Sequence, residues 1–490
     1  MNIDTERLAR RCELFLFALL AVAALLAAVV GRPNADEGWY LHAGRRAIAG
    51  DLLYRDFAFT QAPLSPYVFG AVQAIVPGPR VRLGRATSVL FLLGAAWCAR
   101  GFARRIGGRA AGSLALLLIL ASPDFLYFAA IVKSYALCAF LLALSGALLF
   151  DERGARRAWA PFPAALAAAT RLSLAPVAAV LLFATLHARR EALDDAGRRR
   201  AFVAFFLGLS PLLLALADPR AFVDQAIFFH LAFTTENTLH EQVRLIQAMH
   251  APLRGAAAVG LAALWFCDRR AAVWLTLAIP AIVLPNFWPA AHHAEYVELA
   301  IPFAAAVAAA GLTRVPGPRG LRWLAAGLFA VWALVAGAHR LDDCYGFRDL
   351  DERTHRWDAL RPIEEAAAAI DSLSTPGDTL LTWCTIVAVE ARRPVPQGLD
   401  MAHFSFALAA RAGHSVVDLH ESPEEFGAAL AARYRLLFWE RGMNRMRWVP
   451  AGFWRRAWGP FRTLREYEGF GQWQGDALLF ESKRWSATRG

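Results

Sequence analysis

Long apolar runs separated by short charged segments make up most of the chain before residue 339. A membrane-spanning helix needs about 20 apolar residues, so runs of this length predict transmembrane helices. The pattern predicts eleven of them, at roughly 14–31, 85–103, 109–122, 125–150, 157–170, 172–188, 201–217, 253–267, 271–286, 296–313 and 321–338. The apolar stretch 64–76 is too short to cross, and we expect it to lie in the membrane interface or to form a re-entrant segment.

The loops between these runs sort by charge. Arg-rich loops alternate with loops that hold neither Lys nor Arg, such as 122–124 and 287–295. Basic loops stay in the cytoplasm. The rule places six loops there, at 7–11, 100–109, 151–157, 189–200, 268–270 and 314–322. The N-terminus is then cytoplasmic, whereas loops 32–84 and 218–252 and everything after residue 338 lie outside.

Residues 339–490 have a different pattern, with charges throughout and no further span. Helix-like and strand-like segments alternate there, and the final pair reads as a hairpin. The segments are "RPIEEAAAAIDSLS", "DTLLTWC", "IVAVEARR", "EEFGAALAARY", "RLLFWE" and "TLREYEGF" followed by "DALLFESK". We therefore expect a membrane domain at 1–338 and an external soluble α/β domain at 339–490. The Trp- and Arg-rich stretch 438–458 indicates interfacial anchoring or sugar stacking.

Composition supports a multi-pass membrane protein. Hydrophobic residues make up 57% of the 490 residues and charged residues only 19%, and the mean hydropathy is +0.36. The net charge of +11 lies in the loops, so it indicates topology and gives no reason to expect nucleic acid as a partner. The six cysteines form no metal-binding spacing, but Cys344 and Cys384 face the oxidising side and could form a disulfide.

Two carboxylates, Asp36 and Glu37, follow the first predicted span within "RPNADEGWYLHAGRRAIAGDLLYRDFAFTQAPLSPY". One interpretation is that Asp36 or Asn34 only caps the helix that ends near Gly50. The other is that this helix lies along the outer interface on its aromatic face. A carboxylate would then lie at the edge of the bilayer, where a water-soluble acceptor can meet a lipid-borne donor.

This stretch resembles the first external loop of the C-type (GT-C) membrane glycosyltransferases. It is most similar to the branch of protein O-mannosyltransferases and lipid A aminoarabinose transferases. In that branch an Asp-Glu pair precedes a Tyr, a "YRDF"-like turn and a Pro-rich segment, here "QAPLSPY". The segments "SPDFLYFAAIVKSYALCAFLLAL", "ATRLSLAPVAAVLL" and "HHAEYVELAIPFAAAVAAAG" resemble later parts of the family in order. The soluble tail resembles the family's external domains only in being α/β.

The resemblance implies a GT-C-like polytopic α-helical fold and an inverting hexosyl or pentosyl transferase. The donor would be a polyprenyl-phosphate-linked sugar, and the acceptor an envelope glycan, lipid or protein on the outer face of the inner membrane. A polyprenyl phosphate leaves as a stable anion, so the reaction needs a base and phosphate-binding cations but no general acid. Asp36 matches the family's catalytic Asp, with Glu37 as second candidate. Expected substrate-binding residues are Tyr40, Asp56, Lys133, Tyr135, Arg171, His292, His293 and Tyr296.

Each assignment has a structural alternative. Lys133 can extend to the interface from within its apolar run, Arg171 can occupy an ordinary turn between spans, and Asp56 can pair with Arg55. His292 and His293, with Glu295, could hold a divalent metal, but adjacent histidines point to different faces of a helix. No cofactor is expected. A polytopic transporter or lipid flippase is the alternative function, although the informative polar residues cluster at the external ends of the spans.

The predicted topology can be tested with a reporter that is active only outside the cytoplasm. We expect activity when it is fused after Gly490 and silence when it is fused after Arg199, because these points lie on opposite sides. Reversed outcomes would contradict both the topology and the outer location of Asp36.

Overall fold

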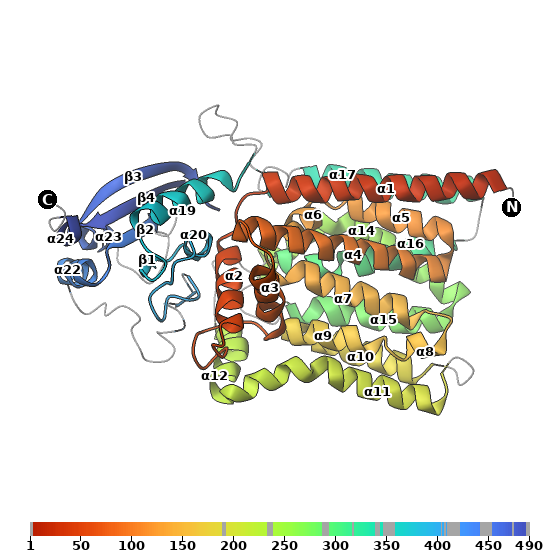
Figure 1. Cartoon of the computed structure of the whole chain (residues 1–490). Coiled ribbons are helices and arrows are strands. Elements are labelled where there is room, and N and C mark those ends of the chain that lie inside the picture. Colours follow the sequence, from red (N-terminus) through yellow and green to blue (C-terminus); the bar gives the residue numbers. More distant parts are fainter. Residues whose placement is uncertain are drawn as a thin grey trace.

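The computed structural model describes residues 3–188, 193–232, 239–286, 294–315, 318–338, 344–345, 358–402, 404–405, 408, 422–441, 453–472 and 475–486. A bundle of long helices forms one part of the molecule, and a small α/β domain lies against one end of it (Figure 1). The N-terminus and α8 (Gly154–Arg157) lie at the opposite end. This placement agrees with the expected separation of the basic loop 151–157 from the C-terminal domain.

Helices occupy all eleven stretches in which spans were predicted. The helices of the bundle are α1 (Ile3–Val30), α4 (Arg80–Gly107), α5 (Arg109–Leu120), α6 (Pro123–Ala130), α7 (Ser134–Leu149), α9 (Pro161–Thr170), η1 (Leu172–Leu174), α10 (Ala175–Leu186), α11 (Asp195–Leu209), η2 (Ser210–Ala217), α14 (Leu239–Cys267), α15 (Arg269–Val283), η4 (Leu284–Asn286), η5 (Ala294–Ala300), α16 (Ile301–Leu312) and α17 (Arg319–Ala338). Three short elements, α12 (Pro219–Val223), η3 (Asp224–Phe228) and α13 (Phe229–Ala232), follow η2.

The observed helices differ in length and bounds from several of the predicted spans. In the described part of the chain, four segments are long and apolar enough to cross alone, namely Arg10–Val30, Arg80–Gly107, Asp195–Ala217 and Glu295–Leu312. The helices α5 and α6 meet at a bend of 76° and together would make a fifth. The predicted span 125–150 is broken between α6 and α7, and α14 begins at Leu239, well before the predicted start at residue 253.

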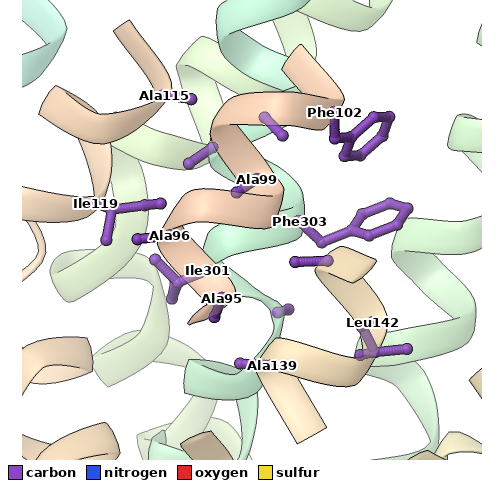
Figure 2. Packing of buried hydrophobic residues seen from close by; sticks show 14 of the residues in the cluster. Ala95, Ala96, Ala99, Phe102, Ala115, Ile119, Ala139, Leu142, Ile301 and Phe303 are labelled. Carbon is purple, nitrogen blue, oxygen red and sulfur yellow. The ribbon is translucent and has the colours of Figure 1, made fainter. Parts of the chain in front are cut away.

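Small residues allow the central helices to pack closely. Alanines of α4 (Ala95, Ala96 and Ala99) face α5, α7 and α16 in the buried cluster that Figure 2 shows. Phe102 and Phe303 fill the space beside them, with ring centroids 5.2 Å apart. Small side chains let helix backbones approach in membrane proteins, where van der Waals contact is a main source of helix association.

Two helices cross the end of the bundle that carries the C-terminal domain. These are α2 (Ala35–Ile48) and α3 (Leu64–Ile75), which run across the direction of the bundle helices (Figure 1). They touch where a Cβ on Gly70 would lie 2.2 Å from the carbonyl oxygen of Gly44, so this crossing requires glycine. We expected this helix to lie along the outer interface on its aromatic face. Its continuous run of buried residues, Glu37 to Gly44, shows that protein covers it on more than one face.

The C-terminal domain contains a four-stranded sheet in the order β1-β2-β4-β3. β1 (Leu380–Thr382) is parallel to β2 (Leu436–Glu440), and the hairpin of β3 (Phe461–Phe470) and β4 (Gly475–Ser482) adds antiparallel strands. Helices surround the sheet: α19 (Arg361–Leu373), α20 (Thr385–Glu390), α22 (Pro423–Arg433), α23 (Phe453–Ala457) and α24 (Lys483–Ser486). The predicted α/β pattern is confirmed. The anchoring interpretation of stretch 438–458 is wrong for Trp439, Trp454 and Trp458, which are buried in the domain core.

Polar contacts join the C-terminal domain to the bundle. Asp400 lies 3.0 Å from Nε2 of His42 and accepts a 2.6 Å hydrogen bond from Arg46, both on α2. Burial lowers the pKa of His42, although Asp400 acts in the opposite direction. Arg82 at the start of α4 forms ion pairs with Asp358 and Glu364. The Asp400 contacts thus tie α2 to the C-terminal domain, and the Arg82 ion pairs tie α4 to it.

Cys344 and Cys384, which could have formed a disulfide, are not bonded to each other. Cys344 and Cys384 are both free and buried, Cys344 in the bundle cluster and Cys384 in the core of the C-terminal domain. The possible bond does not form, because the two cysteines belong to separate hydrophobic cores.

Candidate functional site

The first turn of α2 separates the roles of its two carboxylates. Asn34 is the N-cap, and its side chain accepts from the amide of Asp36 at 3.1 Å. Glu37 completes the capping box by accepting from the amide of Asn34 at 2.9 Å. The carboxylate of Asp36 accepts instead from Nε1 of Trp39 at 3.2 Å and forms an ion pair with Lys133. The interpretation of Asp36 as a cap is therefore not supported.

Glu37 is a structural residue in this arrangement. Its carboxylate is fully buried and accepts two hydrogen bonds from Arg85 of α4, at 2.6 and 2.8 Å. Arg85 also donates to the carbonyl oxygens of Ala28 and Gly31 at the end of α1, at 2.8 Å each. A buried carboxylate with this many partners is unsuited to receive a proton from a substrate, so the interpretation of Glu37 as a second catalytic candidate is not supported.

Lys133 lies in the extended break between α6 and α7. The amide of Val132, the preceding residue, donates to Glu37 at 3.1 Å, so the buried ion pair also fixes this break. The Lys133 ammonium lies 2.9 Å from Asp36 and 3.7 Å from Glu295 of η5, and its side chain is 5% exposed. The ammonium therefore points inward to two carboxylates, which argues against extension to the interface.

Arg171 provides a second cation in a second break, between α9 and η1. Its guanidinium lies 4.5 Å from the ring centroid of Tyr296 and 5.6 Å from that of Tyr135. The Lys133 ammonium lies 5.6 Å from the same Tyr135 ring. Such distances permit cation–π attraction. The structure thus brings together Asp36, Lys133, Tyr135, Arg171 and Tyr296, residues that the sequence pointed to one by one.

A cavity of about 280 Å³ begins at this cluster. Arg171 and Tyr296 form part of its wall, and the external loop contributes Thr60, Gln61 and Ala62. Its apolar lining comes from Leu172, Ala226, Ile227, Leu231 and Pro285. A hydrogen bond of 2.6 Å between Nε2 of His230 and the carbonyl oxygen of Thr60 closes one side. The cavity therefore combines a cation with an apolar surface.

The other predicted site residues differ in outcome. Tyr40 is buried in α2, and burial raises its pKa to about 12, so its phenol stays protonated. Asp56 accepts from Arg55 and from the amide of Leu52, which lowers its pKa to about 2. These contacts favour the structural interpretation of Asp56. His292 and His293 lie outside the described residues. Among the residues that are described, no group of three or more His, Cys, Asp or Glu side chains is arranged to hold a metal ion.

The fold is that of the C-type (GT-C) membrane glycosyltransferases, a class of polytopic membrane enzymes. ArnT from Cupriavidus metallidurans, solved with bound undecaprenyl phosphate, is similar with a TM-score of 0.62 and 17% identity, over 95% of this chain and 97% of that one. The apo structure of the same protein is similar with a TM-score of 0.61 and 18% identity. The Archaeoglobus fulgidus oligosaccharyltransferase tethered with an acceptor peptide is similar with a TM-score of 0.52 and 11% identity, over 88% of this chain and 69% of that one. No family model and no curated protein matches the chain. The expected fold is thus confirmed by structure.

Two residues of the site region were not predicted. Arg85 is the first residue of the predicted span 85–103, where an arginine normally reaches water, so the pattern gave no sign of its buried partner Glu37. Gln472 accepts a 3.0 Å hydrogen bond from the amide of Ala35, beside Asp36. No local sequence pattern could predict that contact, because 437 positions separate the two residues.

The buried ion pair predicts a stability effect that is separate from catalysis. Glu37→Gln and Arg85→Met should each lower the free energy of unfolding by about 3–5 kcal/mol, because each leaves an uncompensated buried partner. Thermal unfolding in detergent measures the loss. Arg55→Ala, which breaks an exposed pair, should change little. Wild-type stability of Glu37→Gln would show that the pair is dispensable.

Proposed function

We propose that the chain transfers a sugar, with inversion, from a polyprenyl-phosphate-linked donor to an acceptor. The observation that carries the proposal is the Asp36–Lys133 ion pair, together with Arg171 on the other side of the Tyr135 contact. Arg171 in turn lines a partly apolar cavity. The likeness in fold to a protein solved with undecaprenyl phosphate supports the donor class. A hexosyl or pentosyl donor fits the family resemblance.

The two cations suit the donor side of this reaction. Negative charge develops on the bridging oxygen as the bond between the sugar and the phosphate breaks. Lys133 and Arg171 would stabilise that charge in a site with little water, where such interactions are strong. The apolar wall formed by Leu172, Ile227 and Leu231 suits the first isoprene units of the lipid.

Asp36 suits the acceptor side. It would orient the acceptor nucleophile and take its proton as the new glycosidic bond forms. In the resting site its carboxylate is paired with Lys133. A donor phosphate would compete for the same ammonium, so donor binding would loosen the ion pair and leave Asp36 more available to the acceptor.

The proposed orientation follows the loop charges. The N-terminus would be cytoplasmic in a multi-pass inner-membrane protein, and the C-terminal domain would lie outside with Asp36. A transporter or flippase is the alternative. The ionic cluster lies at one end of the bundle beneath the soluble domain, which favours an enzyme that acts on the membrane surface.

Mass spectrometry of envelope glycans, lipids and glycoproteins tests the proposal in cells with and without the protein. We expect one glycosylated product to disappear without the protein and to return on complementation. An unchanged set of products, together with altered lipid distribution between the leaflets, would favour the flippase.

Asp36→Asn should abolish transfer in a folded protein. The variant keeps a hydrogen-bond acceptor for Trp39, and Asn34 still caps the helix. Loss of a general base typically costs about 10²- to 10⁴-fold in rate. Restoration of the missing product by each variant measures the effect. Asp51→Asn, at an exposed pair beyond the end of α2, is the control and should restore it fully. Full restoration by Asp36→Asn would exclude the base.

Lys133→Ala should weaken binding of undecaprenyl phosphate, because it removes a cation from a buried site. The chain has only two lysines, so Lys483→Ala is a matched control; its ammonium donates to a carbonyl in the C-terminal domain. Titration of the purified proteins with undecaprenyl phosphate should show weaker binding for the first variant only. Equal affinities in all three proteins would contradict a phosphate-binding role.

A further inference from the structure

One of the backbone amides in the first turn of α2 has its hydrogen-bond acceptor in the C-terminal domain. The amide of Asn34 donates to Glu37, that of Asp36 to the Asn34 side chain, and that of Glu37 to the Asn34 carbonyl. These three acceptors belong to residues 34–37 themselves. The amide of Ala35 donates to Oε1 of Gln472, in the turn between β3 and β4.

This contact completes the turn on the side that carries Asp36. The first amides of a helix have no acceptor within the helix, so each needs one from elsewhere. The Ala35 N–H belongs to the Asn34–Ala35 peptide group, which lies one peptide before Asp36. Holding this peptide group fixes the backbone from which the Asp36 side chain projects. Gln472 therefore restrains the catalytic carboxylate through the backbone, without touching it in the contacts that the structure describes.

The C-terminal domain also packs against the same turn at a second point. A Cβ on Gly38 would lie 2.2 Å from the amide nitrogen of Ile386 and 2.5 Å from Oγ1 of Thr385, at the start of α20. The domain backbone thus lies directly on α2 two residues after Asp36. Further from the turn, Arg45 donates to the carbonyl oxygen of Arg393 at 3.0 Å. The domain holds α2 on both sides of Asp36.

We propose that Gln472 is a positioning residue for Asp36, and that the C-terminal domain completes the active site by fixing the first turn of α2. The proposal rests on the proposed function of Asp36. From the bundle side, Lys133 and the Glu37–Arg85 pair hold the same turn. The carboxylate is thus held at a fixed distance from the donor cations by contacts from both parts of the molecule.

Two substitutions of Gln472 separate the effect of its hydrogen-bond acceptor from the effect of its size. Gln472→Met keeps the length of the side chain but removes the acceptor oxygen, whereas Gln472→Glu keeps an acceptor. Arg441→Met is the control, because it breaks an exposed pair with Asp476 near the same hairpin without contacting α2. Hydrogen–deuterium exchange, read at single amides across residues 34–38, reports the contact without requiring turnover.

In Gln472→Met, the Ala35 amide hydrogen should exchange with deuterium about tenfold faster than in the wild type. This is the effect of losing one ordinary hydrogen bond. The Met variant should also restore the missing envelope product severalfold more slowly, while its affinity for undecaprenyl phosphate stays unchanged. The Glu variant should retain wild-type exchange and most of the transfer. The Arg441→Met control should match the wild type in all three measurements.

The outcomes distinguish this proposal from the proposed function. Unchanged exchange at Ala35 in the Met variant would overturn the positioning role. Faster exchange with full transfer would show that the contact exists but does not position Asp36, which also overturns it. A wild-type protein that makes no product would refute the transferase function, while the exchange result would still report whether Gln472 holds the turn.

Discussion

The buried ion pair between Glu37 and Arg85 is the contact on which the site depends. Arg85 reaches the end of α1 through two carbonyl oxygens, and Glu37 reaches the start of α2 and the amide of Val132. Removing two charges from water is costly, and such a pair is tolerated only when its hydrogen bonds are nearly complete. The pair meets that condition by joining three helices and a helix break. Asp36 and Lys133, the residues of the proposed reaction, are the sequence neighbours of this junction.

Lys133 and Arg171, the two cations of the proposed donor site, lie in interruptions between helices. Lys133 precedes α7 and Arg171 precedes η1 and α10, each with an extended backbone. Inside a membrane, irregular backbone persists only where protein or a cavity surrounds it. The start of a helix also favours negative charge, so each break pairs a cation with the positive end of a helix dipole. This arrangement suits a phosphate. The choice of lysine at one break stands out because the chain otherwise uses arginine almost throughout.

Sequence reasoning predicted the architecture well, because hydrophobic runs and loop charge are local signals. It located the helical stretches, the α/β pattern of the C-terminal domain and the residues Asp36, Lys133, Arg171 and Tyr296. It did not separate the roles of Asp36 and Glu37, because adjacent carboxylates look alike until a partner such as Arg85 is known. Burial of Trp454 and Trp458 was missed for a similar reason, since an aromatic stretch looks the same in a core and at an interface. Contacts across the whole chain, such as that of Gln472, have no local signature.

The contact between Ala35 and Gln472 also imposes an order on biogenesis. Ribosomes make α2 early, but its last acceptor is 437 residues away, near the end of the chain. The first turn of α2 therefore lacks this acceptor until the helices of the bundle have been made and the C-terminal domain has folded. A truncated or stalled chain would carry Asp36 and both cations but would lack the contact that completes the turn.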